Sequence, residues 1–261
     1  RILSADGQTL RFEPDAALEP LRRYHLYVSY SPYLRDLAGN RIHNSYRYFT
    51  TGDGEDNSVP AVAQTSFSAG ATNIPVNGRI VIELDERLGG QCALASGVSL
   101  SSSLGDEAIS VSLENDRTTL VIEAVNNLQT LTEYSVTLDG LCDYAGNAIS
   151  AYSLSFTTSD VASDDTTSPT LVSITPSNNS TYVDVATDIV MTFSEPVDQR
   201  SAPPITGGGI TVPGSYSVRG DTITFTPSVS LQGGIQYRVD LRYKVPDFVG
   251  NYRYLGYSYF T

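Results

Sequence analysis

Short runs of alternating apolar and polar residues recur along the whole chain. They include residues 8–12, 24–28, 46–49 and 223–225, and Gly, Pro and Asn lie between them. A period of two is typical of strands that bury one face, and the intervening residues are typical of turns. No segment requires a helix. The pattern therefore predicts an all-β protein made of short strands.

The strand pattern occurs in three copies. An Asp-x-x-Gly-Asn motif begins at Asp36, Asp143 and Asp247, and a Phe-Thr pair follows each Asp after 13 residues. A tyrosine precedes each motif, six residues after a leucine and twelve after an apolar strand residue. These tyrosines are Tyr24, Tyr134 and Tyr237. Equal intervals of this kind indicate homologous modules of about 100 residues.

Two small, polar and acidic stretches separate the copies, and the prolines that open the next copy are Pro60 and Pro169. From these prolines onward, the second and third copies run in parallel without a gap as far as Glu86 and Glu195. The predicted division is half-module 1 (1–51, the C-terminal half of a domain), a linker (52–59), module 2 (60–158), a linker (159–168) and module 3 (169–261).

The spacing of the strands predicts how each module folds. Short strands about ten residues apart, separated by turn residues, favour an antiparallel sandwich with Greek-key connections. Ile80, Ile82 and Leu84 are expected to form one buried strand face, which Ile189, Met191 and Phe193 form in module 3. The repeated tyrosine, at the start of a long strand, suits a tyrosine corner, with the ring inside and the hydroxyl bonded to the backbone.

The segments that carry a family resemblance are residues 169–177, 189–197, 223–227, 237–239, 247–251 and 259–261. They resemble the bacterial Ig-like domain known from S-layer proteins and tandem surface arrays. The resemblance covers module 3, most of module 2 and the second half of a first domain. Module 2 departs from it where Leu84-Asp85-Glu86-Arg87 replaces Phe-Ser-Glu-Pro, and residues 99–112 align poorly.

The resemblance implies tandem Ig-like antiparallel β-sandwiches with Greek-key topology. It also implies an exported bacterial protein, secreted or at the cell surface, without catalytic activity of its own. We therefore expect a structural array in a surface protein, a filament or an S-layer. The alternative is a ligand-binding module, for carbohydrate or adhesion, within a larger secreted protein or enzyme.

Charge and composition exclude two classes of partner. The chain has 16 Lys and Arg against 29 Asp and Glu, a formal net charge of −13, which repels nucleic acid and anionic lipid. No run of about 18 apolar residues is present, so we expect no membrane insertion. Residues 1–10 lack the apolar core of a signal peptide, and we expect a mature fragment of a longer protein.

Few residues suit catalysis or covalent linkage. The two histidines, His25 and His43, both lie in half-module 1, and no nucleophile elbow, metal-binding histidine cluster or phosphate loop is present. We therefore expect no enzyme. Cys92 and Cys142 both lie in module 2, which favours a disulfide between them but also fits two buried thiols.

The Asp-x-x-Gly-Asn motif has a structural and a functional interpretation. In the first, Gly-Asn provides a positive φ and the Asp accepts backbone N–H groups. In the second, Ig-like topology brings each motif beside the preceding acidic linker, and the crowded carboxylates bind calcium, although no EF-hand spacing is present. The candidate ligands are Asp53, Glu55, Asp56, Glu86, Asp143, Asp164, Asp165, Glu195 and Asp247.

Tyrosine is abundant, with 17 Tyr and no Trp. Tyr46, Tyr48, Tyr257 and Tyr259 lie in the same strand as an inward-pointing phenylalanine, so they are expected to face outward. The simple explanation is the preference of tyrosine for strands. The functional explanation is a contact surface that stacks on a glycan or binds another subunit.

Half-module 1 has no counterpart of residues 169–213, so its apolar side chains should lack a covering sheet. At about 1.5–3 kcal/mol for each large side chain, the loss is on the order of 10 kcal/mol. We therefore expect strands of another chain, a neighbouring subunit or a separated piece of the protein, to complete it. The alternatives are that the protein is longer or that the half-module packs on its neighbour. The residues concerned are Leu10, Phe12, Leu18, Tyr24, Leu26, Val28 and Phe49.

Overall fold

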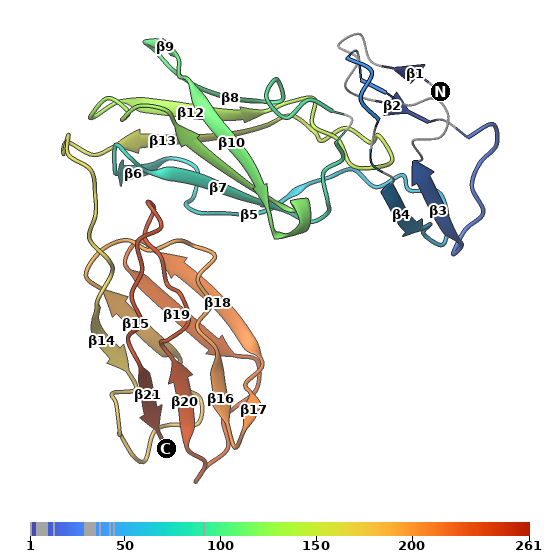
Figure 1. Cartoon of the computed structure of the whole chain (residues 1–261). Coiled ribbons are helices and arrows are strands. Elements are labelled where there is room, and N and C mark those ends of the chain that lie inside the picture. Colours follow the sequence, from blue (N-terminus) through green and yellow to red (C-terminus); the bar gives the residue numbers. More distant parts are fainter. Residues whose placement is uncertain are drawn as a thin grey trace. The chain divides into compact units, whose positions relative to one another are not determined.

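The computed structural model describes residues 2–3, 10–12, 14–28, 35–36, 38–41, 43, 45–90 and 92–261 (Figure 1). The chain forms two compact units, Arg1–Ser58 and Val59–Thr261, and the second contains modules 2 and 3. Within the described residues, the one helical element is a short 3-10 turn, Asn115–Arg117, so the predicted all-β class is confirmed. Among the same residues, no helix is both long and apolar enough to cross a membrane.

Module 2 is a sandwich of two sheets (Figure 1). One sheet has the order β10 (Ile109–Glu114), β11 (Thr119–Ala124), β7 (Arg79–Leu84) and β5 (Val62–Thr65). The other has the order β6 (Ala71–Ile74), β13 (Tyr152–Thr158), β12 (Glu133–Leu138), β8 (Val98–Ser102) and β9 (Gly105–Asp106). All these pairs are antiparallel except β6 with β13, which run parallel.

Module 3 has the same architecture (Figure 1). Its first sheet has the order β14 (Leu171–Thr175), β15 (Ile189–Phe193), β19 (Thr222–Pro227) and β18 (Gly214–Arg219). Its second has the order β17 (Ile210–Thr211), β16 (Ile205–Gly207), β20 (Tyr237–Asp240) and β21 (Tyr257–Phe260). The two-sheet antiparallel sandwich predicted from the strand pattern is therefore confirmed in both modules.

The cores lie between the sheets and are built from the predicted alternate residues. Ile80, Ile82 and Leu84 are buried, as are their module 3 counterparts. The tyrosine corners are also confirmed, because the hydroxyl oxygens of Tyr134 and Tyr237 accept the N–H groups five residues earlier, at 3.0 and 2.7 Å. The Tyr24 hydroxyl accepts the corresponding N–H at 2.8 Å.

A disulfide joins two loops of module 2. It links Cys92, in the loop after β7, to Cys142, in the loop after β12, with 5.8 Å between their Cα atoms. Cys142 is buried and pairs with Ala148 through a short backbone bridge. The bridge therefore ties the segment around Cys92 to the loop that carries the Asp143 motif.

In the described part of the unit Arg1–Ser58, β1 (Ile2–Leu3) pairs antiparallel with β2 (Leu10–Arg11), and β3 (Arg23–Val28) forms a hairpin with β4 (Ser45–Thr50). Phe49 in β4 is 49% exposed, whereas the corresponding Phe156 and Phe260 are at most 2% exposed. Leu18, Leu26 and Phe12 are also exposed, and the side chain of Leu10 lies outside the described part. The apolar face of the β3–β4 hairpin is therefore exposed within the described part of this unit. Its completion by another polypeptide stays a prediction.

Candidate metal centre

The Asp-x-x-Gly-Asn motif forms a tight loop around its own aspartate. One carboxylate oxygen of Asp247 accepts the N–H groups of Val249, Gly250 and Asn251 at 2.8, 2.6 and 2.8 Å. The other accepts the Asn251 side-chain amide at 2.9 Å. Gly250 has φ near 100°, a conformation that favours glycine. Asp143 and Asp36 make corresponding bonds, so the predicted structural role of the motif is confirmed.

Three carboxylates meet where module 3 joins module 2. Asp165 comes from the linker, Glu195 follows β15, and Asp247 opens the motif. One oxygen of each lies within 4.8 Å of the others, and Asp247 is only 3% exposed. Within the described residues, none of the three forms a salt bridge. The Thr167 hydroxyl lies 2.7 Å from an Asp165 oxygen and 3.4 Å from a Glu195 oxygen, adding a further oxygen to the group.

The linker is held in place by asparagines from both modules. The Asn77 side chain accepts the Asp165 N–H at 3.0 Å and donates to the Asp165 carbonyl at 3.1 Å. Asn251 donates to the same carbonyl at 3.2 Å. Asp164, also predicted as a ligand, lies outside the group of three and accepts the Asn127 amide at 2.6 Å. The linker backbone therefore directs Asp165, rather than Asp164, toward the other two carboxylates.

The carboxylates lie in an unfavourable electrostatic environment. Burial, and then the negative charges of Asp165 and Asp247, raise the pKa of Glu195 above its ordinary value. Burial also raises the pKa of Asp247, in spite of the hydrogen bonds that its carboxylate accepts. A cation between the carboxylates would offset this repulsion. Because all the available ligand atoms are oxygens on loops, the donor set suits a hard ion such as Ca²⁺.

Two acids of module 2, equivalent to Glu195 and Asp247, also lie close together. Glu86 and Asp143 have carboxylate oxygens within 4.8 Å of each other, and Asp143 is 2% exposed. The linker acids Asp53, Glu55 and Asp56 belong to the unit Arg1–Ser58. Their predicted approach to Glu86 and Asp143 stays a prediction.

The same motif loop also inserts an aromatic side chain into module 2. Phe248 is 7% exposed and belongs to the module 2 core cluster. Its ring meets Phe67 edge-on, with 5.5 Å between centroids, and its carbonyl accepts the Arg79 N–H at 2.9 Å. A Cβ at Gly250 would lie 2.4 Å from the Arg79 guanidinium carbon, so a larger residue there would displace the Arg79 side chain as well as adopt a strained positive φ. The candidate metal centre therefore lies at a packed junction.

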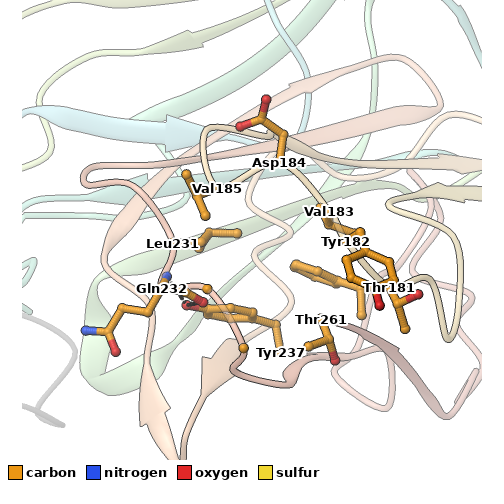
Figure 2. A pocket seen from close by; sticks show the side chains of 12 residues that line it. Thr181, Tyr182, Val183, Asp184, Val185, Leu231, Gln232, Tyr237 and Thr261 are labelled. Carbon is orange, nitrogen blue, oxygen red and sulfur yellow. Dashed lines mark hydrogen bonds between the residues drawn. The ribbon is translucent and has the colours of Figure 1, made fainter.

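The opposite end of module 3 carries a pocket of about 520 Å³ (Figure 2). Figure 2 shows Val183, Val185, Leu231 and Tyr237 among the side chains that line it. The Leu231 N–H donates to the Val185 carbonyl at 2.8 Å, as Leu128 donates to Val76 in module 2 at 2.9 Å. The two ends are therefore equivalent in backbone structure.

The equivalent end of module 2 is covered. Val76 is 1% exposed, whereas Val185 is 41% exposed. In module 2 the chain continues past β13, and the Ser159 N–H donates to the Ile74 carbonyl at 2.8 Å before the linker leads into module 3. The pocket of module 3 therefore lies at the position that, in module 2, is covered by the linker and the next module.

The tyrosines predicted as a contact surface differ in exposure. Tyr46 and Tyr48 are more than half exposed, and Tyr257 and Tyr259 are partly exposed. Phe260 and Ser258, which alternate with the latter pair, are buried. The two rings lie 6.0 Å apart on the outer side of the sheet. Their cationic neighbours were not predicted from the sequence.

A family profile described as bacterial Ig-like domain matches residues 56–158 and again residues 165–261. No curated protein sequence matches the chain. Among solved structures, the N-terminal part of the bacterial S-layer protein SbsC is 13% identical, with a TM-score of 0.32. The alignment covers 78% of this chain but 44% of that one, so this chain spans less than half of the length of that N-terminal part. An L,D-transpeptidase from Mycobacterium smegmatis is 11% identical, with a TM-score of 0.30, over 61% of this chain and 59% of the other.

Proposed function

Since this chain belongs to the bacterial Ig-like domain family, we propose that it is a non-catalytic array of structural modules in a secreted or surface-exposed bacterial protein. The observation that carries the proposal is the junction between modules 2 and 3. Phe248 of one module lies in the core of the other, and asparagines of both hold the linker. A flexible tether would need none of these contacts. The junction instead favours a fixed spacing of modules, as a filament or an S-layer requires.

Calcium is part of this proposal. We infer that Asp165, Glu195 and Asp247 bind one Ca²⁺ and thereby hold the linker against both modules. Their mutual distance, their burial and their all-oxygen chemistry support this assignment. A second site would use Glu86 and Asp143 with one or more of the linker acids Asp53, Glu55 and Asp56.

Two open apolar surfaces suggest how such modules associate. The apolar pocket of module 3 corresponds to the end of module 2 that another module covers. We infer that a further Ig-like module packs on it. The open face of the β3–β4 hairpin, which includes Phe49 and Leu26, would be covered by strands from another polypeptide.

Small-angle scattering of the full chain, in calcium and then in chelator, tests the fixed spacing. The expected result is a sharp maximum dimension in calcium that broadens in chelator, and a Glu195→Gln variant that is broad in both. Asp164→Asn is the matched control, because Asp164 adjoins the site but lies outside the group of three. A distribution equally broad for wild type in both solutions would contradict a fixed junction.

Photo-crosslinking tests the association. A photoreactive residue at Phe49 lies on the apolar face of the hairpin, and one at Tyr48 lies on the opposite face. Crosslinks between polypeptides are expected from position 49 and not from position 48. Equal crosslinking from both positions, or none from position 49 at concentrations where the protein assembles, would contradict completion of the half-module.

The rival function is ligand binding, and one observation favours it. Arginine and lysine side chains stack on the outward tyrosines of module 3, which a purely structural sheet does not need. Assembly of the protein without glycan binding would support the structural array. Glycan binding without assembly would support the ligand-binding function.

A further inference from the structure

The outer face of the second sheet of module 3 and the loop between β20 and β21 carry a surface of tyrosines and cations. We define this Tyr–Arg surface by Arg238, Arg242, Tyr243, Lys244, Tyr254 and Tyr257. The guanidinium carbons of Arg238 and Arg242 lie 5.0 and 4.2 Å from the centre of the Tyr257 ring. We propose that this surface binds an acidic polysaccharide.

The fold does not require these side chains. The strands β20 and β21 pair in the same register as β12 and β13, with Tyr237 opposite Phe260 and Tyr134 opposite Phe156. At the positions of Arg238 and Tyr257, module 2 has Ser135 and Ser153, whose hydroxyls lie 2.8 Å apart. The same sheet is therefore built with small polar residues in module 2. Folding of the sheet therefore does not explain the presence of tyrosine and arginine on the Tyr–Arg surface.

The Tyr–Arg surface is locally positive, although the chain as a whole is negative. The chain has a formal net charge of −13, yet its one lysine, Lys244, lies here with Arg238 and Arg242. Among the described residues of the surface and its hollow, Asp240 is the acid, and it is paired with Arg242 at 3.3 Å. Charges farther away than about 8 Å are largely screened at physiological salt, so an approaching ligand meets a local excess of positive charge.

A hollow beside the stacked rings offers room for a sugar. It has a volume of about 520 Å³ and is lined by Pro204, Asp240, Arg242, Tyr243 and Tyr254. Tyr243 and Tyr254 are 45% and 64% exposed, so their ring faces can receive the apolar face of a sugar ring. The Asp240–Arg242 pair provides an acceptor and donors for hydroxyl groups. A planar guanidinium also matches a carboxylate.

The charge density selects among anionic ligands. Double-stranded DNA carries a charge about every 1.7 Å, which needs a denser and uninterrupted set of cations than this surface offers. An acidic peptide would satisfy the cations but would not use the exposed ring faces. A polysaccharide with carboxylates on some of its sugars uses both. The surface therefore favours a sparsely charged glycan.

A related combination occurs in half-module 1. His25 and Tyr46 occupy the positions of Arg238 and Tyr257, and their rings lie 5.4 Å apart. The Arg23 guanidinium lies 4.7 Å from the centre of the Tyr48 ring. Half-module 1 and module 3 thus combine tyrosine with a basic side chain on the outer face, whereas module 2 does not. A repeating polymer could bind at both places.

The test is the affinity of the full chain for galacturonate oligosaccharides, measured by calorimetry in chelator so that calcium bridging does not contribute. Matched neutral galactose oligosaccharides and polyglutamate are the comparison ligands. Binding is expected to be at least tenfold weaker for each comparison ligand. Arg242→Ala and Tyr254→Ala should each weaken galacturonate binding at least tenfold.

The control variants remove the same residue types elsewhere in module 3. Arg219 and Tyr182 are exposed and lie outside the Tyr–Arg surface, so Arg219→Ala and Tyr182→Ala should leave affinity within twofold. Tyr254→Phe keeps the ring and should also bind within about threefold. Absent binding, equal binding of polyglutamate, or equal loss in the control variants would overturn the proposal. Scattering and crosslinking report on the array separately, so the two proposals fail independently.

Discussion

Replacing Phe248 by alanine should destabilise module 2, although Phe248 belongs to the sequence of module 3. The side chain is 7% exposed and lies in a cluster with Phe67 and other core residues of module 2. It is absent from the core cluster of module 3, which is centred on residues such as Met191 and Phe225. A substitution in the sequence of module 3 therefore removes a packing contact from the core of module 2.

The magnitude follows from burial. Phe→Ala in a core typically costs about 3–5 kcal/mol, and a residue at a junction, where neighbours can relax, should fall at the lower end. A loss of about 3 kcal/mol corresponds to about a hundredfold change in the unfolding equilibrium. Relative to a total domain stability of about 5–15 kcal/mol, this is a large effect.

Native-state hydrogen exchange followed by mass spectrometry separates the modules. The amides of β7 and β11, around Ile82 and Ile122, should exchange about a hundredfold faster in Phe248→Ala, while those around Met191 change less. Tyr144→Ala is the matched control. Tyr144 holds the same position in the module 2 motif but is 65% exposed, so its removal should change stability by about 0.5 kcal/mol or less.

The reasoning would be refuted by unchanged protection of β7 and β11 in Phe248→Ala. It would also be refuted if only module 3 lost protection, because Phe248 would then act within its own module. Equal losses in Phe248→Ala and Tyr144→Ala would show that the motif loop, rather than the buried ring, carries the effect.

Three further perturbations should give measurable results. Calcium at 100 times its Kd adds about 2.7 kcal/mol at a site, so chelation should lower the melting temperature of the wild type. Glu195→Gln should reduce this difference, and equal melting curves for the wild type in calcium and in chelator would contradict calcium binding. Cys92→Ala with Cys142→Ala should cost about 4 kcal/mol in urea unfolding, from the 50-residue separation of the cysteines, and a loss below 1 kcal/mol would contradict this. Burial raises the pKa of Tyr216 from 10 to about 12, so the stability it contributes is complete below pH 10 and is lost as pH rises toward 12. Denaturation of Tyr216→Phe should therefore depend less on pH than that of wild type between pH 10 and 12.

The sequence was most informative where a structural requirement is local. Alternation placed Ile80 and Ile82 on a buried face because strand periodicity directly sets which side chains share a face. The tyrosine corner and the motif loop were predictable for the same reason, since Tyr134 and Asp143 bond to backbone groups within five residues.

Contacts between modules were not predictable in this way. The local pattern around Phe248 does not show which core the side chain enters. The one available signal was that Phe248 is aromatic, whereas Leu37 occupies the same position of the first motif. The sequence also left Asp164 and Asp165 equivalent, whereas Asn77 fixes the linker so that only Asp165 joins the carboxylate group. Lys244 was not identified because its relation to Tyr252 depends on how the loop folds back.

The position of Phe248 also determines how the chain would respond to a pulling force. Because the ring lies in the core of module 2, module 3 cannot unravel without leaving a void beside Phe67. Mechanical failure of module 3 would thus weaken the preceding module, and extension under load should occur in coupled rather than independent steps.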